Sequence, residues 1–350
     1  MTRTTIDQIA KQAGVSAGTV SRILNGKNKE NRPAIAARSA RIRQLAAELG
    51  YRPNAAARSM SRGRFGVMTF VTCGEMGFDW FSRRLLWGVH RQLEDQGESL
   101  VVSELDADKF SDPEFVPRLF QESATDGIVL NHDPKLDDQV VGFFMSQPVP
   151  GVLVNRKSDT NSIYPDEIGG ARAATNHLLQ QGRKHIGYFR LTCDDGNESH
   201  YSVSDRYQGY LDAMRDAGLP SNRCVLGDQR FRQGQDINGV DQAEAYLNLY
   251  PDVNGVVCYE LADAVALYAA AMRKNLSIPD EFRIIVFADS LAYTTVNLPI
   301  DTILIPFDAV GMAAVEMVRA IGDESSMHPP SKSIAYQQLF DAKTRHVESI

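Results

Sequence analysis

Residues 5–26 read TIDQIAKQAGVSAGTVSRILNG, and this stretch predicts two short helices joined by a tight turn. Thr5 is a good cap for the first helix, and Gln8 stands where a capping box needs it. Gly14 is expected to end that helix, because glycine adopts the left-handed conformation at little cost. Ser16 is expected to cap the second helix. The pattern is that of a helix-turn-helix, whose second helix enters the major groove of DNA.

The second helix should present a polar stripe outward, because its apolar side chains recur with helical spacing. Ala17 and Gly18 are too short for a bidentate contact with a base, so Arg22 is expected to carry the main direct readout. A third helix should begin at Pro33, a residue type suited to the first helical turn. The residues predicted to contact DNA in this segment are Thr5, Ser16, Ala17, Gly18, Thr19, Ser21, Arg22 and Asn25.

Charge separates the first 64 residues from the rest of the chain. They hold 13 Lys and Arg residues against three acidic residues, a net charge of +10. The remaining residues carry 24 basic and 41 acidic side chains, a net charge of −17. A basic segment on an acidic body is typical of a protein that binds a polyanion through that segment alone. A solvated basic surface is the alternative interpretation.

A second short motif, YRPNAAARSM, follows at residues 51–60. Pro53 fixes a start and Asn54 can act as a cap, after which the alanine-rich remainder favours a helix. A helix this short is marginal alone in water, so a plain linker is the alternative interpretation. The residues predicted to contact DNA here are Tyr51, Asn54, Ala57 and Met60.

After Arg64 the chain alternates between buried-strand patterns and helical patterns, which predicts an α/β architecture with parallel sheets. The pattern runs once through the first half of the body and then starts again, so two sheets are expected. The expected strands are 66–72, 99–103, 127–130, 150–155, 186–189, 255–258 and 283–289. The expected helices are 79–96, 113–122, 169–181, 205–217 and 263–274.

Composition limits the class of protein further. A chain of 350 residues with 43% hydrophobic content has room for two or three domains with real cores. Neither a leader pattern nor a run of 18 apolar residues occurs, so a soluble, cytoplasmic protein is expected. The cysteines show no metal-ligand spacing, so reduced thiols, no metal and no cofactor are expected. They are Cys73, Cys193, Cys224 and Cys258.

These motifs together closely resemble the LacI family of bacterial transcriptional regulators. The resemblance implies a DNA-binding headpiece at residues 1–61, with a hinge helix at about 53–61 that folds when two copies meet in the minor groove. Met60 stands where the family usually has a leucine that wedges a central base step. Residues 65–350 would form a two-lobed, periplasmic-binding-protein-like domain for effector binding and dimerisation.

The resemblance also implies that the chain crosses between the two lobes three times, near Tyr164, Ser290 and Ser325. A small ligand would bind between the lobes, at the carboxyl ends of the strands. The expected first lobe comprises residues 65–163 and 291–325, and the expected second lobe comprises residues 164–290 and 326–341.

Four residues of the body are candidates for ligand contact by this resemblance. Arg206, in the segment SDRYQG, corresponds to an arginine that usually faces the effector, and its planar fork suits hydroxyls or a carboxylate. Asn155 stands where relatives often have a ligand-bound aspartate. Phe81 either forms an apolar wall for a sugar ring or packs in the core. Asp289 either binds the ligand or orients the lobe hinge.

The sequence departs from the family at two places, so the family's ligand contacts do not carry over to these positions. Tyr259-Glu260-Leu261 replaces the usual Asn-Asp pair, and Ala288 replaces the first aspartate of the usual Gly-Phe-Asp-Asp. A sugar-like effector is therefore expected only as a class.

Signatures of common enzyme classes do not occur in the sequence, so no catalytic residue is expected. The predicted function is a sequence-specific transcriptional regulator, a repressor that binds a pseudo-palindromic operator as a homodimer. A cytoplasmic ligand-binding protein or enzyme of the same two-lobed fold, without operator binding, is the alternative.

Overall fold

The computed structural model divides the chain into two compact units, Met1–Phe65 and Gly66–Ile350. We call the first unit the headpiece and the second unit the body. The structure describes residues 4–25, 32–52, 64–73, 82–106, 109–110, 112, 115–121, 125–131, 138–191, 200–226, 238–291, 298–323, 328–344 and 346–349.

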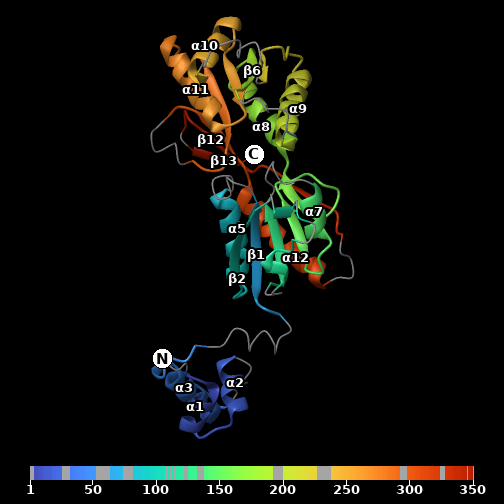
Figure 1. The fold of residues 1–350 in the computed structure, drawn as a ribbon. Helices are drawn as coiled ribbons and strands as arrows, with labels where there is room; N and C mark the ends of the chain where they lie inside the picture. The colour runs from blue at the N-terminus through green and yellow to red at the C-terminus, as the bar shows by residue number, and fades with distance from the viewer. Residues whose placement is uncertain are drawn as a thin grey trace. The chain divides into compact units, whose positions relative to one another are not determined.

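The described part of the headpiece contains three helices, which share one small core (Figure 1). They are α1 (Ile6–Ala13), α2 (Ala17–Leu24) and α3 (Pro33–Glu48). Val15, in the turn between α1 and α2, packs against this core. The buried side chains of this core come from all three helices: Ile9, Ala10, Val20, Ile23, Ile42 and Ala46.

The first lobe of the body is built on a parallel sheet with strand order β11-β5-β4-β3-β1-β2. Its strands are β1 (Val67–Cys73), β2 (Ser99–Leu105), β3 (Gly127–Asn131), β4 (Gly151–Val154), β5 (Ser162–Pro165) and β11 (Lys332–Ile334). Helices α5 (Arg83–Glu94) and α12 (Phe307–Asp323) pack on one face. Helices α6 (Arg118–Gln121) and α7 (Asp138–Met145) pack on the other face.

The second lobe has the strand order β13-β12-β10-β9-β8-β6-β7, in which β12 and β13 are antiparallel. Helices α8 (Glu167–Gln180) and α9 (Tyr201–Asp216) cover one face, and α10 (Gly239–Leu249) and α11 (Leu261–Arg273) cover the other (Figure 1). The strands are β6 (Ile186–Arg190), β7 (Cys224–Leu226), β8 (Gly255–Cys258), β9 (Arg283–Ala288), β10 (Asp301–Leu304), β12 (Gln338–Asp341) and β13 (His346–Ser349).

The predicted positions of two of the three crossings between the lobes are wrong. The first crossing follows β5 directly, beside Tyr164. The second does not lie near Ser290, because β10 is fully buried and pairs with β9, so the chain leaves the second lobe only after Leu304. The third does not lie near Ser325, because β11 pairs with β5 in the first lobe. Residues 301–304 therefore belong to the second lobe, and residues 332–334 belong to the first.

No helix in the described residues is both long enough and apolar enough to span a bilayer.

Candidate DNA-binding surface and interlobe site

The predicted helix caps of the headpiece are confirmed. The Thr5 side chain accepts the backbone N–H of Gln8, while the Gln8 side chain accepts that of Thr5, which completes the capping box. Gly14 ends α1 with a φ of 68°. Ser16 accepts the N–H of Thr19 and so caps α2. These bonds satisfy amide groups that a short helix otherwise leaves unpaired.

The outward face of α2 carries one long cationic side chain between shorter polar ones. Gly18 and Arg22 are exposed. Ser21 accepts a hydrogen bond from the Asn25 amide at 3.2 Å, and the hydroxyls of Ser16 and Thr19 lie 3.0 Å apart. The short polar groups are therefore held against their own helix, and Arg22 is the group with the longest reach from this face.

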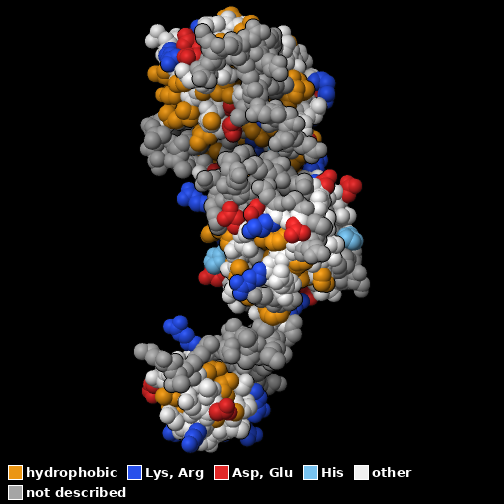
Figure 2. All heavy atoms as spheres, in the orientation of Figure 1, with side chains coloured by type: hydrophobic (Ala, Val, Ile, Leu, Met, Phe, Trp, Pro, Cys, Tyr) orange, Lys and Arg blue, Asp and Glu red, His pale blue; other side chains and the backbone are white. Residues whose placement is uncertain are grey.

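The remaining predicted DNA contacts differ in position. Ala17 and Tyr51 are partly buried and pack against the headpiece core. Asn54, Ala57 and Met60 lie outside the described residues. On the face drawn in Figure 2, Lys and Arg side chains (blue) are spread over the headpiece.

The second candidate site lies where strand ends of the two lobes are joined by hydrogen bonds; we call it the interlobe site. It comprises Asn155 after β4, His200 and Arg206 of the α9 region, Tyr259 after β8 and Asp289 after β9. Because β6, β8 and β9 are parallel, their carboxyl ends fall on one edge of the second sheet. The predicted candidate Phe81 lies outside the described residues.

Arg206 is buried and forms a bidentate ion pair with Glu167 at the start of α8. Its Nε donates to one carboxylate oxygen at 2.6 Å, and its Nη2 donates to the other at 3.0 Å. Gly209 permits this approach of α8 and α9, because a Cβ there would lie only 2.3 Å from the carbonyl oxygen of Ile168. The predicted donor fork of Arg206 is therefore occupied by the protein's own carboxylate.

His200 connects the two lobes. Its Nδ1 accepts the backbone N–H of Ser202, so Nε2 carries the hydrogen that it donates to the carbonyl oxygen of Asn155 at 2.8 Å. Burial lowers the pKa of His200, which favours this neutral form. Asn155 adopts a φ of 61°, a conformation that asparagine tolerates better than most residues. A second interlobe contact is the ion pair between Lys157 and Asp205, at 2.8 Å.

Asp263 joins the segment after β6 to the start of α11 in the second lobe. Its carboxylate accepts the backbone N–H groups of Leu191, after β6, and of Glu260, at the start of α11. Burial raises the pKa of Asp263 to about 7, although these two hydrogen bonds oppose the shift.

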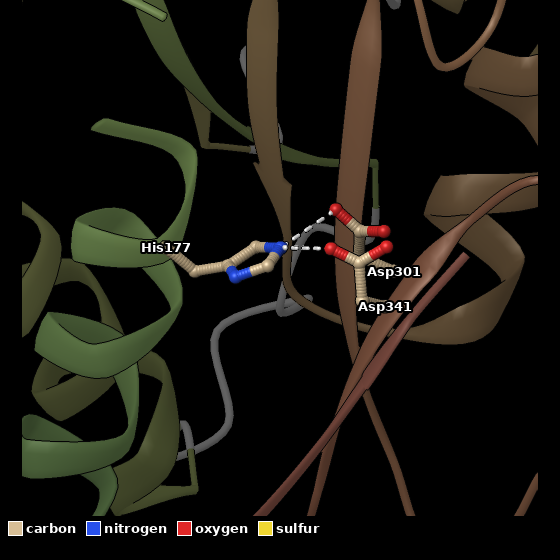
Figure 3. Close-up of side chains that lie close together, drawn as sticks. All are labelled: His177, Asp301 and Asp341. Carbon is tan, nitrogen blue, oxygen red and sulfur yellow. Dashed lines mark hydrogen bonds and ion pairs between the residues drawn. The ribbon is translucent and has the colours of Figure 1, made fainter. Parts of the chain in front are cut away.

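His177, Asp301 and Asp341 form a buried cluster beside the start of β10, and their side chains point toward one another (Figure 3). Arg283 donates to Asp301 at 2.5 and 3.1 Å and to Asp341 at 2.7 Å. A guanidinium in this position occupies the carboxylate oxygens that a cation would need. The cluster therefore fits a structural ion-pair network that ties α8, β9, β10 and β12 together.

Comparisons with known proteins identify both units of the chain. Residues 5–54 match the family model of bacterial regulatory proteins, lacI family, and residues 175–338 match that of the periplasmic binding protein-like domain. The HTH-type transcriptional regulator RegA of Clostridium saccharobutylicum is 26% identical over 344 residues, covering 96% of this chain and 98% of RegA. GalR of Escherichia coli (strain K12) is 27% identical over 322 residues, covering 91% and 89%.

The chain is a transcriptional regulator of the LacI family. A solved structure of the Lac repressor dimer bound to operator and an anti-inducer matches this regulator with a TM-score of 0.68 and 17% identity. The match covers 95% of this chain and 97% of that chain, and it shows that the two proteins share a fold.

The sequence did not predict several residues that belong to the interlobe site of this regulator or hold its side chains in place. Glu167 and Tyr336 are far from Arg206 in sequence, and no local pattern marks them as its partners. His200 precedes the expected start of its helix, because α9 begins at Tyr201 and not at residue 205.

Proposed function

We propose that this LacI-family regulator is a repressor that binds a pseudo-palindromic operator as a homodimer and responds to a small, sugar-like effector. The observation that carries this proposal is the exposed, capped recognition helix on a unit with a net charge of +10. A regulator of transcription acts where the DNA is, so the proposed location is the cytoplasm. Residues proposed for DNA contact are Thr5, Ser16, Ala17, Gly18, Thr19, Ser21, Arg22, Asn25, Tyr51, Asn54, Ala57 and Met60.

The effector is proposed to bind at the interlobe site, in contact with Asn155, Arg206, Asp289 and Phe81. Support comes from the convergence of strand ends and from the hydrogen bonds that cross between the lobes there. A ligand that favours one lobe arrangement would change operator affinity only through its different affinity for the two arrangements.

The experiment that tests this function has two steps. Genomic fragments retained by the full-length protein are first sequenced to define an operator. Operator affinity is then measured by gel shift with neutral sugars, sugar acids and nucleobases added singly. The proposal predicts a defined operator and at least one compound that changes its affinity about tenfold or more, a coupling free energy of about 1.4 kcal/mol. Retention of random DNA without preference would contradict it.

Dimerisation is supported by large apolar side chains that the body leaves exposed. Trp87 on α5 is 50% exposed, and Val101 and Val102 on the edge strand β2 are 46% and 37% exposed. Exposed apolar side chains on adjacent elements such as α5 and β2 mark a candidate interaction site. We expect Trp87→Glu to yield monomers in sedimentation analysis and to weaken operator binding, with Arg91→Glu, which changes charge beside Trp87, as the control. A dimer that persists in Trp87→Glu would place the interface elsewhere.

A further inference from the structure

The charge of the interlobe site depends on a residue outside the predicted ligand contacts. Glu167 is 2% exposed and stands at the first position of α8, directly after the first crossing between lobes. Its carboxylate accepts two hydrogen bonds from Arg206 and one from the Tyr336 hydroxyl, at 2.6 Å. Tyr336 lies on the third crossing segment, so the carboxylate is fixed from two sides.

Arg206 is also held by groups other than Glu167. Its Nη1 donates to the carbonyl oxygen of Tyr259 at 2.8 Å, and its guanidinium carbon lies 4.2 Å from the Phe287 ring centre. Three of its five N–H groups therefore donate to protein acceptors, and the bidentate carboxylate neutralises its charge. The two other N–H groups remain suited to a neutral oxygen acceptor, such as a hydroxyl.

An anionic ligand would meet an unfavourable field at this position. It would share Arg206 with Glu167, and two carboxylates on one cation repel each other. The described charged groups at the same strand ends carry both signs. Lys157 is paired to Asp205 and Arg156 to Asp138, while Arg190 lies 5.0 Å from the Tyr259 ring. The acidic side chains Glu260, Asp263 and Asp289 complete the set.

We propose that Glu167 is the specificity-determining residue of the effector site, because it occupies the donor fork of Arg206 and so makes the site select an uncharged ligand. Carboxylates and phosphates built on the same ring are rejected. This inference rests on the proposed effector function of the interlobe site, and it narrows the effector from a sugar or sugar derivative to a neutral one.

The test compares the full-length protein with Glu167→Gln, which keeps the size of the side chain and removes its charge. Asp166→Asn is the matched control, because it removes one negative charge at the neighbouring residue. Asp166 caps α8 by accepting the N–H of Gly169, a role that asparagine retains. Binding of galactose, glucose and ribose, and of their acids and phosphates, is measured by calorimetry.

The expected wild-type result is that each neutral sugar that binds does so at least tenfold more tightly than its acid or phosphate. Glu167→Gln should reduce that ratio tenfold or more, and Asp166→Asn should leave it unchanged. The double variant Glu167→Gln/Arg206→Gln, which has no unpaired guanidinium, should reject anions as the wild type does. Wild-type preference for an acid, or an unchanged ratio in Glu167→Gln, would overturn the proposal.

Sulfate provides an arm that does not depend on any sugar. Melting temperatures are measured in sodium sulfate and in sodium chloride at equal ionic strength. Glu167→Gln should gain more stability from sulfate than the wild type, Asp166→Asn or the double variant, since only it carries an uncompensated Arg206. Equal gains in all four proteins would overturn the proposal. Failure of the wild-type protein to bind any operator would instead contradict the proposed function.

Discussion

Arg22 is the side chain on which base recognition should depend most. It is exposed on the outward face of α2, while the Asn25 side chain donates a hydrogen bond to the Ser21 hydroxyl. We predict that Arg22→Ala loses discrimination at one base pair in each half-site, a loss of about 1–3 kcal/mol, because a bidentate contact with a guanine disappears. Operator selection with the variant measures this loss position by position.

Arg22→Lys is the matched control, because it keeps the charge and loses the fork. It should lose the same discrimination while retaining most of the affinity for random DNA. If Arg22→Ala selects the same operator with unchanged preference at every position, the main readout lies on another residue.

Asp301 should make the free energy of unfolding of the body decrease in acid. Burial opposes its ionisation, but hydrogen bonds from His177 and Arg283 outweigh burial and lower the pKa of Asp301. A lowered pKa contributes stability that is present above the ordinary pKa of about 4 and is lost as pH falls through the folded value. We predict that Asp301→Asn costs about 3–5 kcal/mol at pH 7, because Arg283 is left buried without its main partner.

Urea unfolding at pH 7 and below pH ~4 checks this prediction, since the gap between wild type and variant should narrow in acid. Asp280→Asn, which breaks the exposed ion pair with Lys343, should change stability far less. A gap independent of pH would show that ionisation of Asp301 does not contribute.

For single residues, the sequence predicted roles that depend on atoms nearby in the chain. The helix-cap roles of Thr5, Gly14 and Ser16 were predicted correctly, because each cap acts on atoms within four residues of itself. Arg206 was identified by its motif, but its partner Glu167 is set by the packing of α8 on α9 and has no local signature.

Helix α9 joins the lobes at its first turn, through the neutral His200 ring. The groups that face this ring are Glu167, Arg206 and Asp205, and burial dominates, so the pKa of His200 is lowered. A lowered pKa means that the contact is fully favourable above about 6.5 and weakens as pH falls below that value. We predict that amide exchange at the start of α9 accelerates between pH 7 and pH ~5 beyond the chemical rate change.

His200→Gln retains a side-chain donor for the Asn155 carbonyl and does not titrate. Its exchange, corrected for the chemical rate, should not depend on pH in that range. The same pH dependence in both proteins would assign the effect to another group.

The segment around Met60 is predicted to wedge the centre of the operator and to become ordered on DNA. Unstacking a base step costs a few kcal/mol and favours pyrimidine–purine steps, so wild type should prefer such a step at the dyad. We predict that Met60→Ala keeps dimerisation and half-site contacts but loses the DNA bend and much of the operator affinity. Gel phasing measures the bend, and equal bending by both proteins would place the wedge elsewhere.

At the scale of elements, strands that alternate with helices were predictable and strands outside that alternation were not. β10 follows β9 without an intervening predicted helix, and β11 is three residues long with an exposed start. Both acquire their sheet only from long-range pairing, with β9 and with β5. This is why the second and third crossings were misplaced, although the α/β class and the two sheets were expected.

In the whole molecule, the first 64 residues are strongly basic and the rest of the chain is acidic. We expect the basic headpiece to supply the affinity for the DNA backbone and the acidic body to add none, so binding should weaken steeply with salt. We propose that an effector bound at the interlobe site changes operator affinity through the body, because the body and the headpiece belong to one chain. The regulatory role of this protein depends on sequence-specific DNA binding by the headpiece.

Sequence-specific binding is measured by comparing the affinity of the full-length protein for its selected operator with that for a scrambled duplex of equal length, at one physiological salt concentration. A sequence-specific regulator should bind the operator at least about a thousandfold more tightly, and footprinting should protect two symmetric half-sites. Equal affinity for the two duplexes, with binding that depends on salt alone, would show that the protein does not recognise a DNA sequence.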